Sequence, residues 1–194
     1  MRILYLYAHP LPESFHAAIL KEALAGLAEA GHTVDLCDLY AEGFEPMLSA
    51  AARRDYHDTD KNQAGLEQHV ARLRAAEALV VQFPVWSFGP PAILKGYFDR
   101  LFMPGVAFDI ADPADVKQLL GNIRKIAGIA TYGRPWWNAL YLLDPPRTLV
   151  TRYLRRVTGG AARTKFHALY HMNVASEKER AAFMTKVRAA MARF

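Results

Sequence analysis

Cysteine is nearly absent from this chain, because Cys37 is the single one in 194 residues. One cysteine cannot close an intrachain disulfide, and it cannot form the paired spacing of a Cys-x-x-Cys redox or zinc motif. A disulfide-stapled secreted scaffold is therefore excluded, and no metal is expected. A reducing, cytoplasmic location fits this composition best.

Apolar runs of membrane-spanning length are also missing, since nowhere do about 18 apolar residues run together. The opening segment, MRILYLYAHP, has too short an apolar run for a signal peptide and lacks a small-residue cleavage site. We therefore expect a soluble, unprocessed protein without an integral membrane segment.

Two phosphate-binding motifs and a dense basic surface are absent as well. The chain contains no G-x-G-x-x-G and no G-x-x-x-x-G-K-[ST], so neither a Rossmann dinucleotide site nor a P-loop is predicted. The net charge of +5 permits anionic ligands but falls short of the positive face of a nucleic-acid binder. No nucleic-acid partner is expected, and any phosphate must be held by another type of loop.

What the chain does contain is an alternation of short apolar runs with amphipathic segments. Its length and its 52% hydrophobic content suit one domain over residues 1–194. The predicted strands are 2–10, 32–40, 78–84, 124–132 and 164–174. The predicted helices are 15–30, 64–76, a helix starting at Pro91, 147–157 and 176–194, with a long polar excursion over 41–63.

This alternation predicts a three-layer α/β fold around a five-stranded parallel sheet, because parallel neighbours need crossover connections that cover both faces. The flavodoxin-like strand order 2-1-3-4-5 is preferred. In such a sheet, ligands bind beyond the carboxyl ends of the strands, at the switch point. The loops after predicted strands 1, 3 and 4 are therefore the candidate site: AHPLPESFH, PVWSFGPP and TYGRPWW.

The first loop places His9, Ser14 and His16 around the start of a helix. A helix N-terminus offers free N–H groups and a partial positive charge, so with these side chains it predicts a phosphate seat. The plainer alternatives are a surface histidine and a serine that only caps the helix.

The other two loops combine stiff backbone with aromatic rings. Pro84, Gly89 and two further prolines stiffen the first of them, where Gly89 is expected to take a φ open only to glycine and Trp86 and Phe88 form a bed for a flat heteroaromatic ring. Alternatively, both rings belong to the core. In TYGRPWW, two adjacent tryptophans cannot both point inward, so at least one is expected to be exposed as a ligand wall or subunit contact.

Two long stretches resemble a known family. AHPLPESFHAAI and FPVWSFGPPAILKGYFDRLFMPGVAFDI are similar to the flavodoxin-like NAD(P)H:quinone oxidoreductases, which include mammalian quinone reductase and bacterial modulator-of-drug-activity and potassium-efflux ancillary proteins. The most specific part is the pattern P-x-x-x-F-G-x-P-A-I-L-K-G-[aromatic]-F-D-R, and the resemblance spans roughly residues 1–135.

The resemblance implies a set of cofactor-binding residues, which departs from the family pattern at three places. Many relatives carry Asn where this chain has His16, the pair Trp86-Ser87 is uncommon, and TYGR stands where relatives have TTGG. The implied residues are His9, Ser14, Phe15, His16, Pro84, Val85, Trp86, Ser87, Phe88, Thr131, Tyr132, Gly133 and Arg134.

No catalytic side chain is assigned. The Tyr and His that relay charge in mammalian quinone reductase have no clean match here, and Tyr132 and Tyr141 are the remaining candidates. The resemblance implies a flavin, with FAD and FMN both open, and NAD(P)H as co-substrate in a ping-pong, hydride-type reduction of quinones or related aromatic acceptors. It also implies a homodimer with the active site at the subunit interface.

Three alternatives stay open at this stage. One is an azoreductase or nitroreductase on the same fold. Another is a flavin-binding regulatory subunit that docks on a membrane transporter through the basic stretch Arg147–Lys165, although such a stretch is more often a solvated helix face. A one-electron flavodoxin carrier is disfavoured, because those proteins are usually acidic.

Overall fold

A central parallel sheet organises the chain. The computed structural model describes residues 1–112 and 114–194, and within them a five-stranded sheet has the order β2-β1-β3-β6-β7. Its strands are β1 (Arg2–Tyr7), β2 (Thr33–Asp38), β3 (Ala78–Val85), β6 (Lys125–Tyr132) and β7 (Arg163–Leu169), all paired in parallel. This is the predicted order 2-1-3-4-5 once two short extra strands are set aside in the numbering.

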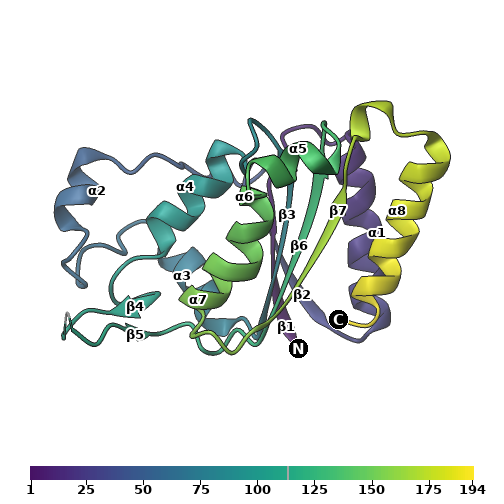
Figure 1. The fold of residues 1–194 in the computed structure, drawn as a ribbon. Coiled ribbons are helices and arrows are strands. Elements are labelled where there is room, and N and C mark those ends of the chain that lie inside the picture. The colour runs from purple at the N-terminus through teal and green to yellow at the C-terminus, as the bar shows by residue number, and fades with distance from the viewer. Residues whose placement is uncertain (113) are drawn as a thin grey trace.

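Helices cover both faces of the sheet and complete the three layers (Figure 1). On one face lie α1 (Phe15–Glu29) and α8 (Glu177–Met191). On the other lie α3 (Glu67–Ala75), α4 (Ala92–Leu101) and a continuous helical segment made of α6 (Pro145–Thr148), the π-helical η1 (Leu149–Leu154) and α7 (Arg155–Val157). The predicted capping box is present at Ser176 and Glu179.

The burial of each strand explains its pattern of apolar and polar residues. The central strands β1, β3 and β6 are buried on both faces, and their sequences are nearly continuous apolar runs. The edge strands β2 and β7 are only partly buried and carry polar residues. The apolar side chains form two clusters, one on each side of the sheet.

Several predicted boundaries are wrong. The strand predicted to run to residue 174 ends at Leu169, because His171 takes a left-handed φ of 59° and the 3-10 turn η2 (Met172–Val174) follows. The first strand ends at Tyr7. Unpredicted elements are α5 (Trp136–Tyr141) and the separate antiparallel pair β4 (Phe108–Asp109) and β5 (Lys117–Gln118); α2 (Ala50–Asp55) lies in the polar excursion.

Across residues 1–112 and 114–194, no helix combines the length and apolar character needed to cross a membrane.

Candidate functional site

The loops after β1, β3 and β6 meet at the carboxyl edge of the sheet, at the top of Figure 1. The His9 ring stacks on that of His16, with ring centroids 5.4 Å apart, and lies 6.3 Å from the ring of Trp86. Pro84 and Val85 pair in register with Thr131 and Tyr132. The predicted loops are therefore brought together as the fold required.

A buried chain of polar side chains supports these loops from below. Gln82 is fully buried and donates to the backbone carbonyl of His16 at 2.7 Å, while its Oε1 accepts from the hydroxyl of Tyr5. Gln82 Nε2 also lies 3.2 Å from His16 Nδ1, and His16 Nε2 lies 2.8 Å from the hydroxyl oxygen of Thr131. Gln82, which lies on β3, thus links β3 to β1 and α1 by hydrogen bonds, and His16 links α1 to β6.

The buried ring of His16 therefore has a structural role. It is 3% exposed, and burial, reinforced by nearby His9, lowers its pKa from 6.5 to about 3. The ring is neutral at ordinary pH, and both its nitrogens already face protein partners. A direct contact between this ring and a phosphate therefore lacks a free nitrogen, so any cofactor contact from His16 would come from its backbone.

The N-terminus of α1 supplies such backbone donors. Ser14 caps the helix, its hydroxyl accepting from the N–H of Ala17 at 3.2 Å. The first-turn N–H groups have no partner within a helix, and those of Phe15 and His16 make no hydrogen bond within the described residues. These two N–H groups are therefore available to an anion at the predicted phosphate position.

Beside this N-terminus lies a cavity of about 480 Å³, whose lining residues include Tyr7, His9, Asp38 and Tyr40. The hydroxyl of Tyr7 is buried and has no hydrogen bond of normal geometry among the described residues, although the Ser14 side chain lies near enough to affect its pKa. His9 meanwhile accepts from the N–H of Leu11 at 3.1 Å, which fixes its ring.

The loop after β3 is a tight, closed turn. Trp86 N donates to Gly89 O at 3.0 Å and Gly89 N donates to Trp86 O at 2.9 Å. Ser87 and Phe88 occupy the two central positions with φ of 48° and 57°, the pattern of a type I′ turn. The expectation that Gly89 needs a φ open only to glycine is wrong, because the turn places its positive φ values one and two residues earlier.

This turn leaves the N–H groups of Ser87 and Phe88 outside its own two hydrogen bonds. Ser87 and Phe88 themselves line a cavity of about 140 Å³ together with Val85, Tyr132, Gly133, Arg134 and Asn173. At Gly133 a Cβ would approach the Asn173 side chain to 3.0 Å, so the absence of a side chain lets the two segments meet. Residues predicted from two loops therefore share one cavity wall.

Tyr132 belongs to a second polar cluster, behind that wall. Its hydroxyl donates to Asp144 Oδ1 at 2.5 Å, and the hydroxyl of Tyr170 donates to Asp144 Oδ2 at 2.9 Å. Arg147 Nε donates to the same carboxylate at 3.0 Å. Burial and the Asp144 carboxylate raise the pKa of Tyr132, so this phenol stays protonated at ordinary pH.

The other tyrosine candidate, Tyr141, lies at the end of α5 with 85% of its surface exposed, and it lines neither of the two cavities described above. Trp136 and Trp137 are 60% and 58% exposed. The sequence predicted that at least one of these two rings is exposed, and both are. Phe15 packs on the α1 and α8 side of the sheet, and Arg134 is exposed.

Sequence reasoning missed the residues that hold the site in place. Gln82 is a polar residue inside the apolar run ALVVQF, a signal that could have marked it. Asn173 and the Asp144 cluster come from the region beyond residue 135, where the resemblance fades, so nothing local marked them.

A family model described as a flavodoxin-like fold matches residues 1–193. The chain belongs to this flavodoxin-like family. Its structure matches that of Smu.1420 from Streptococcus mutans UA159 with a TM-score of 0.86, 30% identity and full coverage of both chains.

Two further relatives carry names of enzymes. The structure of an NAD(P)H:quinone oxidoreductase from Methanothermobacter marburgensis matches this member of the flavodoxin-like family with a TM-score of 0.84 and 25% identity, over 99% of this chain and 98% of the other. The mouse ribosyldihydronicotinamide dehydrogenase [quinone] is 34% identical over 141 residues, which cover 63% of this chain and 60% of the mouse protein. The chain thus spans less than two thirds of the length of that curated relative.

Proposed function

We propose that this chain is a flavin-dependent NAD(P)H oxidoreductase that reduces quinones or related aromatic acceptors by two electrons, with all 194 residues acting as one domain. The observation that carries the proposal is the cradle at the carboxyl edge of the sheet: a helix N-terminus with two free N–H groups, and a closed turn whose Ser87 and Phe88 line a cavity together with residues from the end of β6. Relatives named as quinone-reducing enzymes support the same reading.

The donor set suits a flavin. The N–H groups of Phe15 and His16 fit its phosphate, and the cavity beside them is lined by Tyr7, His9 and Tyr40. The N–H groups of Ser87 and Phe88 fit the polar edge of a ring system. The structure does not choose between FAD and FMN, and both stay in the proposal.

A bound flavin would supply the redox chemistry, taking a hydride equivalent from NAD(P)H and returning it to the acceptor in two half-reactions of a ping-pong scheme. The chain itself would orient the flavin and polarise its ring. Fixed N–H donors at Ser87 and Phe88 favour negative charge at the ring edge, because they need no reorganisation. Phe88 and Trp86 would border the space for the nicotinamide and then for the acceptor.

A homodimer is part of this proposal. Along and after α5 lie large apolar side chains that are 41% to 85% exposed: Trp136, Trp137, Leu140, Tyr141, Leu142 and Leu143. A contiguous patch of this kind is typical of an interaction surface. If a second copy covers this patch, Leu140→Glu should abolish the dimer, which sedimentation of the wild type and of the variant measures.

The test begins with the protein as purified. Its absorption spectrum and the mass of the released cofactor identify the flavin, and rapid mixing with NADH or NADPH shows whether bleaching precedes acceptor addition. A panel of quinones, azo dyes and nitroaromatics then ranks the acceptors and decides between quinone reductase and azoreductase or nitroreductase. Protein that holds no flavin and shows no flavin-dependent NAD(P)H oxidation would sink the proposal.

Docking on a membrane transporter stays a prediction from the sequence. Within the basic stretch, Arg147 is already paired with Asp144, and Arg155 donates to the carbonyl of Gly160. A cytoplasmic location likewise stays a prediction.

A further inference from the structure

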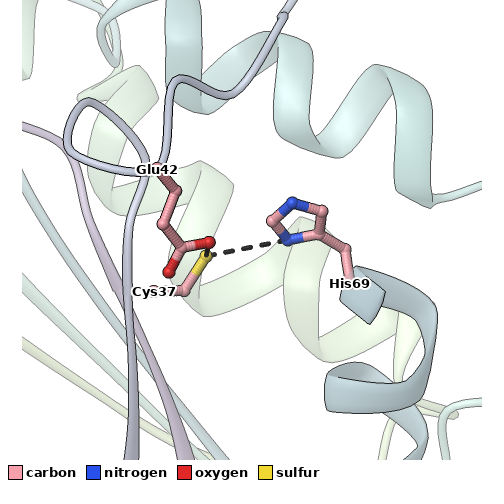
Figure 2. A group of neighbouring side chains, drawn as sticks. All are labelled: Cys37, Glu42 and His69. Atoms are coloured by element: carbon pink, nitrogen blue, oxygen red, sulfur yellow. Dashed lines mark hydrogen bonds between the residues drawn. The ribbon is translucent and has the colours of Figure 1, made fainter. Parts of the chain in front are cut away.

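Three side chains of metal-binding type converge beside the end of β2. Cys37 comes from β2, Glu42 from the turn that follows it and His69 from α3, so distant segments meet here (Figure 2). One ligand atom from each residue lies within 4.8 Å of the other two. Cys37 Sγ is 3.6 Å from Glu42 Oε2 and 3.8 Å from His69 Nδ1.

These separations match the edges of a tetrahedral coordination shell. With Zn–S near 2.3 Å and Zn–N near 2.1 Å, two ligands of a tetrahedral zinc ion lie about 3.5 Å apart. The observed sulfur to nitrogen and sulfur to oxygen distances are within a few tenths of an ångström of that value. The His69 nitrogen and the Glu42 oxygen, which lie within 4.8 Å of each other, would have to come closer to complete the geometry.

A second observation points to a ligand at the same place. Tyr97 is fully buried, and its hydroxyl has no hydrogen-bond partner among the described residues. Its ring meets that of His69 edge to face, with centroids 5.6 Å apart. Burial raises the pKa of Tyr97, so its phenol is a neutral group beside the His69 ring.

The charged groups beside these three residues form ion pairs with one another. Arg72 donates to both carboxylate oxygens of Glu42, at 2.9 and 2.7 Å, and its Nε lies 3.2 Å from Asp35 Oδ1. Arg2 also lies 3.9 Å from Asp35, so two arginines and two carboxylates leave no net charge, and loss of the Cys37 proton on metal binding would leave about −1. A divalent ion would offset this charge, while Arg72 orients the Glu42 carboxylate as an outer-shell partner.

Access and ligand state also fit. Cys37 is buried at the inner end of the group, while Glu42 is exposed and His69 is half-buried, so the group opens to solvent on one side. Burial lowers the pKa of His69, which favours the neutral imidazole that binds metals, whereas burial and Glu42 raise the pKa of Cys37 to about 12, so a bound ion must displace the thiol proton. Arg100 is a further positive charge near His69 that works against a cation, and it points away to donate to the carbonyl of Glu45 at 2.7 Å.

We propose that Cys37, Glu42 and His69 bind one divalent metal ion of borderline softness, zinc above all, with a fourth coordination position open to water beside the Tyr97 hydroxyl. Thiolate, imidazole and carboxylate together are a zinc ligand set, whereas magnesium and calcium prefer oxygen ligands alone. The ion would tie β2 and its following turn to α3. This site is separate from the flavin cradle and does not depend on the proposed activity.

The test titrates chelator-treated, full-length protein with Zn²⁺ by calorimetry and with Co²⁺ by absorption. We expect one equivalent bound, a thiolate-to-cobalt charge-transfer band and a rise in thermal midpoint with Zn²⁺. Losing one ligand should weaken binding by about 100-fold in Cys37→Ser and in His69→Gln, and Glu42→Gln should weaken it by about 10-fold. His57→Gln, at an exposed histidine on the polar excursion, is the matched control and should bind as the wild type does.

The His69 variant keeps the test decisive, because its side chain is not in the core and its loss should leave the fold intact. A wild type that takes up no ion would overturn the proposal. Binding that survives both Cys37→Ser and His69→Gln would do the same, because it would place the metal elsewhere.

Discussion

The two halves of the carboxyl edge of the sheet are built differently. The loops after β1 and β3 are held by the chain itself: Gln82 and His16 bond to one another from below, and the turn over Trp86–Gly89 closes on itself. The segment after β6 is anchored at Asp144 and then leaves large apolar side chains in solvent, Tyr141 at 85% exposure among them.

The difference shows in the cavities as well. The groove beside α5 and α6 has a volume of about 830 Å³, and its lining includes Trp136, Leu143, Asp144, Arg147 and Tyr170. It is larger than the 140 Å³ cavity at the closed turn. The loops after β1 and β3 are thus preorganised for a ligand together with Tyr132, Gly133 and Arg134, whereas the segment from Trp136 to Leu143 offers an open apolar surface to something larger. Substitutions in the first half should change folding and cofactor retention, and those on the exposed face of the second should change association.

Gln82→Leu should have the largest effect on stability. It leaves the Tyr5 hydroxyl, the His16 carbonyl and one His16 ring nitrogen without their partner in a fully buried place. Each such group costs about 1–3 kcal/mol, so the free energy of unfolding should fall by about 3–5 kcal/mol in urea titrations.

Gln68→Leu is the matched control, because Gln68 is exposed on α3. It should change the free energy of unfolding by less than about 0.5 kcal/mol. Equal effects of the two variants would show that the first half is not held by Gln82.

Asp144→Asn should come next, and it tests the anchor of the second half. The carboxylate accepts hydrogen bonds from Tyr132, Tyr170 and Arg147. In the asparagine variant, an NH₂ group replaces one of the two accepting oxygens and faces these donors. Asparagine also tolerates the left-handed φ of 45° at this position, so the change isolates the hydrogen bonds. A loss of about 2–3 kcal/mol in the free energy of unfolding is expected by urea titration.

Trp137→Ala is the comparison within the same half. Its ring is 58% exposed, so the monomer should lose little stability. If Trp137→Ala destabilised the monomer as much as Asp144→Asn, the contrast between anchor and open surface would be wrong.

Acid should weaken the first half through His16. Its pKa is about 3 in the folded protein and near 6.5 in the unfolded chain, so below pH 6.5 the unfolded chain takes up a proton that the folded protein does not. Stability should therefore fall as the pH drops from 6.5 toward 3, by about 1.4 kcal/mol per pH unit at most.

The measurement compares urea unfolding at pH 7.5 and pH 5. The wild type should lose about 2 kcal/mol more over this interval than His16→Asn, in which the titrating ring is gone. The comparison with the variant removes the contribution of the other histidines. Identical pH dependence of the two proteins would mean that His16 is not the buried neutral ring described.

The sequence predicted the fold well where its signals are local. Continuous apolar runs located β1, β3 and β6 because strands buried on both faces need apolar residues throughout, and the capping box at Ser176 located the start of α8. It failed at α5, a helix whose side chains are mostly exposed and so leave no inward apolar stripe.

The site was predictable at the level of loops and not of contacts. Strand ends placed His9, Phe88 and Thr131 at one edge, as parallel topology requires. That His16 faces Gln82 and Thr131, and that Cys37 faces His69, follows from packing between segments 115, 66 and 32 residues apart, which no local pattern encodes.

The smallest stability effect is expected at the closed turn, and it sharpens the distinction between its residues. Ser87 holds a φ of 48°, so the β-branched side chain of Ser87→Val should cost about 1–2 kcal/mol and open the turn. Gly89→Ala should cost less, because a Cβ there meets nothing closer than the Trp86 carbonyl oxygen at 3.8 Å. Flavin retained per protein after gel filtration is the sharper readout: Ser87→Val should lose cofactor, while Ser87→Gly and Gly89→Ala should keep it. If Gly89→Ala lost the flavin while Ser87→Val kept it, the glycine and not Ser87 would be the position on which cofactor binding depends.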